Sequence, residues 1–403
     1  MYELSNFMND KAFIYEEKVT DGKIVYSNKI CINIKGEKLF ELPDKDMFCF
    51  NFEPEDVAFV SNHENKEALM NNKGEFLTDF IYDSILGGSE EGLFEVKRNG
   101  KHGHIDINGK EIIPCMYDDG CYFSEGVAAE YLNGKCGMVD YFNNTVIPFE
   151  YDDIFICKNN LISAKKNGKY GLINKNNKVA FDFLYDEIDC WQTRDCLVYQ
   201  AKKGDKWGLI DRYNNIIEDF IYDDSQLISD NEDNAGEFIF LLKGDKKAVY
   251  STKKKKFITE FVYDFIGYLS EGRICVYKDG KCGFIDTFGE IVIPCIYDIK
   301  REHEFNEGVC VVTKDGKDGM TDLSGNVVVP FEYYRLNDCH EGLICTTCFD
   351  RQEGYINKKG EIIIPFGKYC LCSDFNCGLA SVCCEKFGHV YINKQGEILK
   401  LKI

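Results

Sequence analysis

The stretch GDKWGLIDRYNNIIEDFIYDD, residues 204–224, decides the fold because its pattern recurs along the whole chain. The glycine of Trp207-Gly208 defines an anchor position. Equivalent positions are Ile30, Ala68, Gly103, Gly137, Gly171, Gly208, Ala248, Gly283, Gly319, Gly354 and Val390. Ten steps lead from residue 30 to residue 390, an average of 36 residues per step. A fixed period of this length predicts a tandem-repeat protein.

Two further positions in each repeat predict a tight turn. Three residues after the anchor, every copy has Asp, Asn or Ser, whose side chains accept backbone hydrogen bonds. Three residues later, all copies except that with Lys254 have Gly or Asn, which tolerate positive φ. We therefore expect positive φ at Gly289 but not at Lys255.

Proline and tyrosine mark the end of each repeat. Eleven residues past the anchor stand Pro114, Pro148, Pro294, Pro330 and Pro365. Proline has no N–H, so this position should face away from the strand ladder at an edge or bulge. Three residues further lies an almost constant tyrosine, usually followed by an acid. An acid present in most copies predicts a role in maintaining the fold.

One repeat predicts three strands. Within residues 91–118, EGLFEVKR, HGHID and EIIPCMYD read as strands separated by NGK and INGK turns. A short fourth strand is possible after Tyr-Asp, and no helical pattern of any length is present. Because so small a meander cannot bury its apolar face alone, neighbouring repeats should stack into a continuous core.

Composition restricts the classes of function. The chain has 403 residues, 44% of them hydrophobic, and a net charge of −20. That charge disfavours nucleic acid and acidic membrane surfaces as direct partners. No apolar run reaches the length of a membrane span, and no secretion signal is visible at residues 1–18. We therefore expect a cytoplasmic protein whose 20 cysteines are reduced thiols.

The segments GKYGLINKNNKV (168–179), GDKWGLIDRYNNII (204–217), GKCGFIDTFGEIVIPCIYD (280–298) and GKHGHIDINGKEIIPCMYD (100–118) resemble the bacterial WG repeat, also called KWG. The resemblance covers nearly the whole chain and is strongest from about 90 to 335. It implies a β-rich tandem array with a binding or scaffold role and no shared active site. Only Trp207 keeps the namesake tryptophan, and we expect this mixed tryptophan position to be half exposed.

The predicted fold is all-β, a tandem array of about eleven three-stranded meander repeats. An open twisted array is preferred, with one or two β-propellers as the alternative. The array spans residues 1–403, with divergent capping repeats at about 1–50 and 370–403. A degenerate middle repeat occupies about 238–266.

Candidate chemical sites are weak, and we assign no catalytic, cofactor-binding or metal-ligating residues. The cysteines between Cys339 and Cys384 include a CxxC and a CxC, which are spacings found in structural zinc sites. Cys345 and Cys348 would, however, point to opposite faces of a strand, which disfavours a zinc site. Cys115 and Cys295 stand where other copies have Phe, so they act as small apolar residues. The segments DING (106–109) and SDNEDNAGE (229–237) indicate a turn and a solvated loop rather than calcium sites. The six histidines show no catalytic spacing.

The sequence therefore favours a non-catalytic interaction scaffold, not an enzyme, that presents an acidic β-surface to another protein. Its variable loops at 187–195, 223–237 and 300–307 would provide specificity. The alternative is a carbohydrate or small-ligand binding module that uses exposed aromatic side chains.

Overall fold

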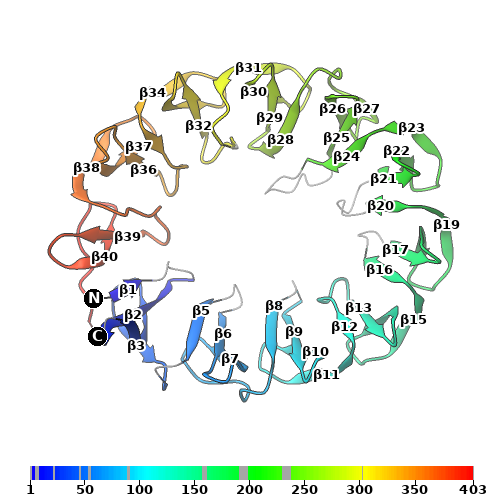
Figure 1. Cartoon of the computed structure of the whole chain (residues 1–403), viewed down its shortest axis with the longest axis horizontal. Coiled ribbons are helices and arrows are strands. Elements are labelled where there is room, and N and C mark those ends of the chain that lie inside the picture. Colours follow the sequence, from blue (N-terminus) through cyan, green and yellow to red (C-terminus); the bar gives the residue numbers. More distant parts are fainter. Residues whose placement is uncertain are drawn as a thin grey trace. The chain divides into compact units, whose positions relative to one another are not determined.

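The computed structural model describes residues 2–4, 9–20, 23–44, 47–52, 56–88, 91–156, 161–189, 198–228, 237–301 and 303–402. These residues form antiparallel sheets and contain no helix, which confirms an all-β fold of tandem repeats (Figure 1). Most sheets have four strands in chain order, and none closes into a barrel. The loop at 229–236 and most of the loop at 187–195 lie outside the described residues.

The described strands fall into eleven successive repeats, of which the eighth and ninth share one seven-stranded sheet. The first five contain β1–β4 (Tyr2–Leu4, Lys11–Thr20, Lys23–Asn33, Lys38–Glu41), β5–β7 (Phe48–Phe52, Val57–Ser61, Glu67–Asn71), β8–β11 (Ser84–Gly88, Leu93–Arg98, Lys101–Asp106, Glu111–Tyr117), β12–β15 (Asp119–Gly120, Val127–Leu132, Lys135–Asp140, Thr145–Tyr151) and β16–β19 (Asp153–Ile156, Leu161–Lys166, Lys169–Asn174, Val179–Tyr185).

The remaining six contain β20–β23 (Glu187–Asp189, Val198–Lys203, Lys206–Asp211, Ile216–Tyr222), β24–β27 (Asp224–Leu227, Phe238–Lys243, Lys246–Ser251, Lys256–Phe257), β28–β31 (Phe265–Ser270, Arg273–Lys278, Lys281–Asp286, Ile291–Asp298), β32–β34 (Val309–Lys314, Lys317–Asp322, Val327–Tyr333), β35–β38 (Arg335–Leu336, Leu343–Thr347, Glu353–Asn357, Ile362–Tyr369) and β39–β40 (Leu379–Cys384, Gly388–Asn393). The fourth strand anticipated after Tyr-Asp is present, as in β12, which begins at Asp119.

The chain forms two compact units. Unit 1 comprises residues 1–132, 139–144 and 333–403, and unit 2 comprises residues 133–138 and 145–332. Unit 1 therefore contains both ends of the chain.

The anchor glycines allow two strands to approach closely. The ladder between β10 and β11 shifts register at the anchor, which pushes the partner strand toward Gly103. A Cβ atom on Gly283 would lie 2.4 Å from the carbonyl oxygen of Ile293, well inside van der Waals contact. The anchor is thus glycine because no side chain fits, whereas its φ is not in the left-handed region.

Two repeats have alanine at the anchor, and there the last strand does not approach the anchor as closely. After Ala68 and Ala248 the last strand is reduced to an isolated bridge or two residues. The backbone N–H groups of Leu69 and Val249 donate instead to the hydroxyls of Thr78 and Thr259, at 2.9 and 2.8 Å. In both repeats a threonine hydroxyl thus accepts the N–H of the residue that follows the anchor alanine.

The predicted Asx turn is present. The carboxylate of Asp106 accepts the backbone N–H groups of Asn108 and Lys110, and Gly109 has a φ of 79°. Gly289 also has positive φ, at 90°, but the expectation for Lys255 is wrong because its φ is 50°. The extra residue in the lysine-rich turn moves the left-handed position from Lys254 to Lys255.

The Tyr-Asp pair joins each repeat to the next. In unit 2, Tyr185 donates to Asn214 at 2.6 Å and its ring stacks on Phe220. Asp152 accepts from Lys135 at 2.7 Å in its own repeat and from the Gly168 N–H at 3.0 Å in the next. The same Lys–Asp contact joins Lys66 to Asp83, Lys101 to Asp118, Lys169 to Asp186, Lys206 to Asp223, Lys246 to Asp264 and Lys281 to Asp298.

The hydrophobic core lies between consecutive sheets. One cluster in unit 2 combines Leu172 and Phe181 of β18 and β19 with Tyr199 and Ile210 of β21 and β22. Burial raises the pKa of the Cys31 and Cys282 thiols to about 12, as expected for cysteines that act as apolar core residues. The expected half exposure of the tryptophan position is wrong for five copies, whose residues at this position are buried: Lys29, His102, Cys136, Cys282 and Asp318.

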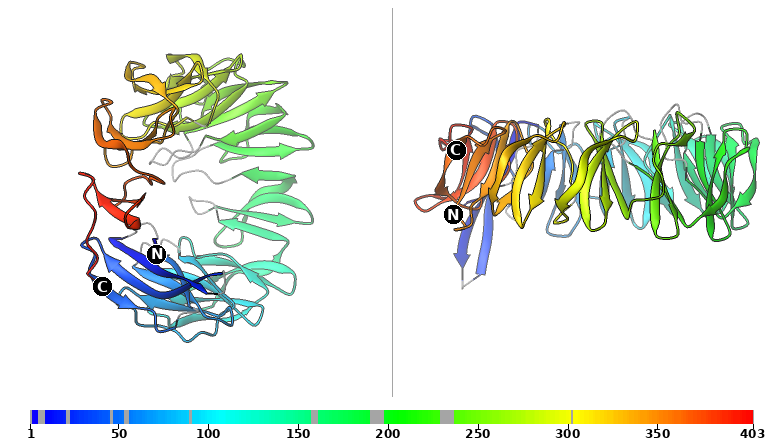
Figure 2. Two further views of the ribbon diagram at one scale, coloured as in Figure 1. Left: turned by 60° about the vertical axis from the view of Figure 1, so that its left-hand side comes forward. Right: turned by 90° about the horizontal axis from the view of Figure 1, so that it is seen from above.

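The two ends of the chain meet within unit 1 (Figures 1 and 2). Ala12, Ile14 and Ile32 of the first repeat form one buried cluster with Leu379 and Tyr391 of the last, against which Leu399 and Leu401 pack. The Lys402 N–H donates to the Gly36 carbonyl at 2.7 Å, in a parallel bridge beside Glu37. The first repeat therefore depends on the last for its burial.

Replacing the anchor glycine by Gly283→Ala should lower the urea midpoint of unfolding, because its Cβ overlaps the Ile293 carbonyl. Overpacking of this kind costs roughly 1–3 kcal/mol. Gly87→Ala is the matched control, since Gly87 has no atom within 4 Å of an added Cβ and no positive φ. Equal midpoints for the two variants would contradict the close-approach argument.

Removal of residues 399–403 should increase amide hydrogen exchange in residues 29–42 of the first repeat, because both backbone and apolar contacts are lost. Lys402→Ala is the control, since it deletes only the exposed ion pair with Glu37. Unchanged protection in the truncated chain would show that the first repeat is stable without the last.

Candidate functional site

A cluster of two histidines and three carboxylates lies in unit 1. His102 and His104 belong to β10, Glu95 to β9, Asp119 to β12 and Glu130 to β13. Alternation along β10 places both imidazoles on one face, because they are two residues apart. Glu95 is directly opposite His104 in the ladder and diagonal to His102. The sheet thus brings three of the five side chains together.

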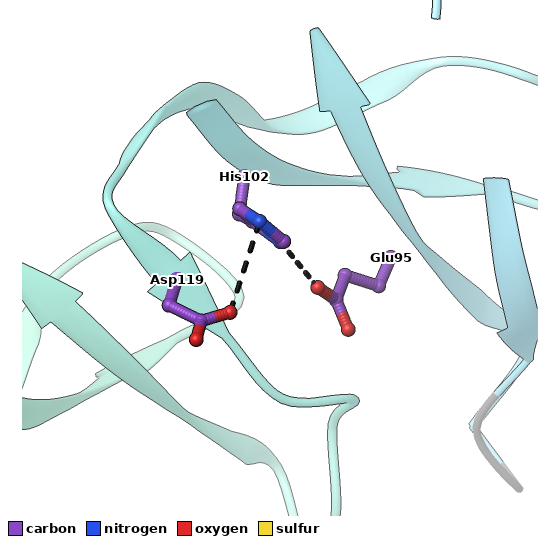
Figure 3. A group of neighbouring side chains, drawn as sticks. All are labelled: Glu95, His102 and Asp119. Atoms are coloured by element: carbon purple, nitrogen blue, oxygen red, sulfur yellow. Dashed lines mark hydrogen bonds and ion pairs between the residues drawn. The ribbon is translucent and has the colours of Figure 1, made fainter. Parts of the chain in front are cut away.

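Three of these residues form a polar trio, which consists of Glu95, His102 and Asp119 (Figure 3). His102 Nδ1 lies 2.5 Å from Glu95 Oε1, and His102 Nε2 lies 3.7 Å from Asp119 Oδ1. Glu95 and His102 are buried, whereas the side chain of Asp119 is 69% exposed. The trio therefore has one side open to solvent.

Next to Glu95 in the ladder, His104 forms a buried pair with Glu130, and both residues are 0% exposed. His104 Nε2 lies 2.6 Å from Glu130 Oε1. The other polar atoms of the pair, His104 Nδ1 and Glu130 Oε2, have no hydrogen-bond partner. Buried polar atoms without partners cost stability, so the fold alone does not explain this pair.

Burial keeps both members of the pair uncharged near neutral pH. Desolvation lowers the pKa of His104 to about 4. Desolvation also raises the pKa of Glu130 to about 9, with further increases from Glu95 and Asp119. A proton is therefore retained on Glu130 in the folded protein at pH values where an ordinary carboxyl has lost it.

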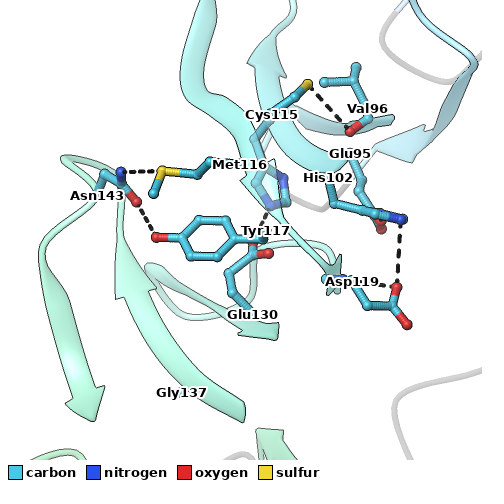
Figure 4. A network of polar contacts seen from close by, with 12 residues as sticks. Glu95, Val96, His102, Cys115, Met116, Tyr117, Asp119, Glu130, Gly137 and Asn143 are labelled. Carbon is cyan, nitrogen blue, oxygen red and sulfur yellow. Dashed lines mark hydrogen bonds and ion pairs between the residues drawn. The ribbon is translucent and has the colours of Figure 1, made fainter. Parts of the chain in front are cut away.

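Small and aromatic residues make room for the cluster. Gly120 is opposite Glu130 in the ladder, and a Cβ on Gly120 would lie 2.4 Å from Glu130 Oε2. The ring of Phe123 contacts that of His104 edge to face at 4.9 Å, and it stacks on Tyr141. Tyr117 donates to Asn143 at 2.6 Å nearby (Figure 4). Gly120 therefore leaves room for the Glu130 carboxyl, and the Phe123 ring packs against His104.

The trio has the composition of a divalent metal site. One ligand atom from each residue lies within 4.8 Å of the others. Among the described residues no other group of three His, Cys, Asp or Glu side chains meets this condition. Imidazole nitrogen with carboxylate oxygen suits first-row divalent ions such as Zn²⁺.

The sequence pattern predicts no site residues here, because the histidines have no catalytic spacing. A comparison of equivalent positions in the repeats does distinguish His104 and Glu130. The His104 position has an apolar residue in the neighbouring repeats, such as Met138, Leu172 and Leu209, and the Glu130 position has Val96 or Ala164. A titratable residue at two core positions marks these repeats as different.

The other candidate sites are placed as follows. Cys345 Sγ lies 3.3 Å from the Cys372 carbonyl oxygen, and Cys370 Sγ lies 3.5 Å from that of Cys383. Cys370 forms an isolated β-bridge with Cys383, whereas Cys345 lies in β36, and among the described residues no three of these thiols meet the distance condition that the trio satisfies. Residues 106–109 form the Asx turn described above. The acidic segment at 229–237 lies outside the described residues except for Glu237.

Comparison with known proteins identifies the family. The sequence profile described as WG containing repeat matches residues 69–101, 103–136, 137–170, 170–207, 250–282, 283–317 and 354–386, which together exceed half of the chain. The chain belongs to the WG-repeat family. The resemblance seen in the sequence is thereby confirmed, and the repeated β-fold is consistent with a binding or scaffold role.

Several solved structures are similar to the WG-repeat chain. A eukaryotic initiation factor shares 11% identity over 76% of this chain and 94% of its own, with a TM-score of 0.40. BamB from Moraxella catarrhalis shares 9% over 87% and 94%, with a TM-score of 0.29. The extracellular domain of a putative hybrid two component system from B. thetaiotaomicron shares 9% over 98% and 64%, with a TM-score of 0.28.

Curated proteins give no match to the sequence. In the part of the chain that the structure describes, no helix has the length and hydrophobicity to span a bilayer.

Glu130→Gln should become more stable relative to wild type as the pH rises. The folded wild type holds the Glu130 proton up to about pH 9, whereas the unfolded chain releases it near 4.5, so wild-type stability falls between these values. The difference should grow by at most roughly 1.4 kcal/mol per pH unit. Urea midpoints at pH 6.5, 7.5 and 8.5, in buffer containing a chelator, measure it.

Glu385→Gln, at an exposed position, is the control for this experiment. A constant offset between Glu130→Gln and wild type across the three pH values would show that Glu130 is ionised in the folded protein.

Proposed function

We propose that the WG-repeat chain is a non-catalytic scaffold that presents an acidic β-repeat surface to a protein partner. The observation that carries this proposal is a row of exposed aliphatic side chains on the last strands of the repeats in unit 2. They occupy one or both of two equivalent positions in four repeats of unit 2, and the row is interrupted at the repeat of β27, where Lys256 stands at the first position. The row consists of Val179, Leu184, Ile216, Ile221, Ile291, Ile296 and Val327.

Near the end of the last strand, consecutive repeats contact each other through aromatic rings. Tyr185 and Tyr222 each stack on a phenylalanine that belongs to the following repeat, Phe220 and Phe261. Ile216 and Ile291 are 57% and 66% exposed. Exposed apolar residues that recur with polar neighbours are typical of protein interaction surfaces.

Charge determines which partner fits this row. Asp182 and Asp219, both exposed, lie between the aliphatic residues of their strands, and the net charge of the chain is −20. A complementary partner surface would carry apolar side chains together with Lys or Arg. The same charge disfavours nucleic acid and anionic lipid.

The recurring carboxylates support a non-catalytic role. The acid after each tyrosine is bonded to a lysine of its own repeat and to an N–H of the next, as at Asp186, which contacts Lys169 and Gly204. These groups are used in holding repeats together. We also propose a cytoplasmic location, for which the buried thiols such as Cys31 and Cys282 are suited.

The alternative is a carbohydrate or small-ligand binding module. It is supported by aromatic side chains at the tips of the Asx turns, where Tyr213 and Phe288 are 76% and 68% exposed. Exposed rings of this kind provide apolar faces for a sugar. The two functions therefore use different residues of the same repeats, and variants can separate them.

Ile216→Lys combined with Ile291→Lys should abolish binding of a protein partner, because two cations are placed in an apolar row that faces a cationic surface. Tyr213→Ser combined with Phe288→Ser is the matched control in the same two repeats. Proteins captured from the native host are quantified by mass spectrometry. A purified captured protein should bind wild type and the control at least tenfold more tightly than the isoleucine variant, with affinity that decreases as salt increases.

Loss of binding only in the Tyr213 and Phe288 variant, together with hits on a glycan array, would favour the carbohydrate-binding alternative. Equal binding by all three proteins would contradict the proposed surface. Thermal unfolding of each variant checks that the fold is retained.

A further inference from the structure

The trio of Glu95, His102 and Asp119 shares no residue with the aliphatic row, and two of its three members are not repeated in the repeats that follow. The tryptophan position that His102 occupies holds Cys136, Tyr170 or Trp207 in the next repeats. The position of Glu95 holds Ala129 or Ser163. Asp119, in contrast, belongs to a recurring acidic position, with Asp153, Glu187 and Asp224 in the repeats that follow. Glu95 and His102 are therefore the residues that distinguish this repeat.

We propose that the trio binds a divalent first-row metal ion of the Zn²⁺ class, with His102 Nε2 and Asp119 as protein ligands and Glu95 as the residue that orients His102. The remaining coordination positions are filled by water, since the side chain of Asp119 is 69% exposed. This inference is independent of the proposed scaffold function.

The distances fit this assignment. Two ligands bonded to one zinc ion at about 2.0–2.1 Å in tetrahedral geometry lie roughly 3.4 Å apart. His102 Nε2 and Asp119 Oδ1 are 3.7 Å apart, and a small rotation of the exposed aspartate closes the difference. An ion placed between the two atoms is therefore within bonding distance of both.

Glu95 supplies the contact that such a histidine requires. Its Oε1 lies 2.5 Å from His102 Nδ1 and accepts that N–H, which leaves the lone pair of Nε2 directed toward Asp119 (Figure 3). A carboxylate that fixes the tautomer of a metal-bound histidine is the common arrangement in zinc proteins. Glu95 is buried, so it holds the ring in one orientation.

The buried pair provides a second, independent observation. Glu130 and His104 are fully buried and each leaves a polar atom without a hydrogen-bond partner; His104 is directly opposite Glu95 of the trio in the ladder. Buried polar groups without partners are rare in native structures, so each calls for an explanation. Glu130 Oε2 faces Gly120, which directly follows the ligand Asp119 in β12.

The test uses the full chain, freed of metal with a chelator, and Co²⁺ alone as the probe. Wild type should bind one more equivalent of Co²⁺ than Asp119→Asn and His102→Tyr, as counted by equilibrium dialysis. The visible d–d absorption of that equivalent should lack the near-ultraviolet band of thiolate ligands, and Zn²⁺ should displace it. Glu95→Gln should retain the site with roughly tenfold to hundredfold weaker binding.

Two controls separate this site from other metal binding. Cys345→Ser removes a thiol of the cysteine cluster and should leave the oxygen- and nitrogen-bound equivalent unchanged. His389→Tyr changes the tryptophan position of the last repeat and should also have no effect. Asp119→Asn alters only an exposed side chain, so the result does not depend on whether His102→Tyr folds.

Equal Co²⁺ stoichiometry and affinity in wild type and Asp119→Asn would overturn the proposal. The trio would then be a group of polar side chains that serves the fold alone. A Glu95→Gln variant that loses thermal stability but binds Co²⁺ as tightly as wild type would show that Glu95 has a structural role only.

Discussion

Each repeat has only one sheet, and a single small sheet cannot cover its own apolar face. Burial therefore depends on the next sheet, as in the cluster that joins Leu172 and Phe181 to Tyr199 and Ile210. Polar contacts also join consecutive repeats, because the tyrosine hydroxyl and the following aspartate both form hydrogen bonds to groups in the neighbouring repeat. Cohesion between repeats is the condition on which every other feature rests.

Within a repeat, the main constraint is the distance between the last two strands. Glycine at the anchor allows a partner carbonyl to lie where a Cβ would be, as at Gly283. Ala68 and Ala248 exclude this approach, and the last strand is then short or absent. Thr78 and Thr259 restore the lost hydrogen bond. The repeats with alanine at the anchor therefore keep a hydrogen bond at this position although their last strand is short or absent.

The cluster of two histidines and three carboxylates differs from the residues that recur along the chain. Residues that every copy shares are fully engaged in holding repeats together, whereas His104 and Glu130 are buried with polar atoms unpaired. A tandem-repeat fold supports such an exception because neighbouring repeats supply enough burial to tolerate one costly position. Two functions can then coexist on one array, since the aliphatic row lies in unit 2 and the cluster in unit 1.

The sequence alone determined the period, the strands, the Asx turns and the family, because these depend on local patterns repeated eleven times. Repetition also showed that the acid after tyrosine serves the fold. The tertiary structure alone decided which residues meet across repeats. Glu95, His102 and Asp119 approach one another through a ladder and a following strand, and the first repeat packs on the last through residues at opposite ends of the sequence, such as Ile14 and Leu379. Such contacts depend on register and burial, which no local spacing in the sequence records.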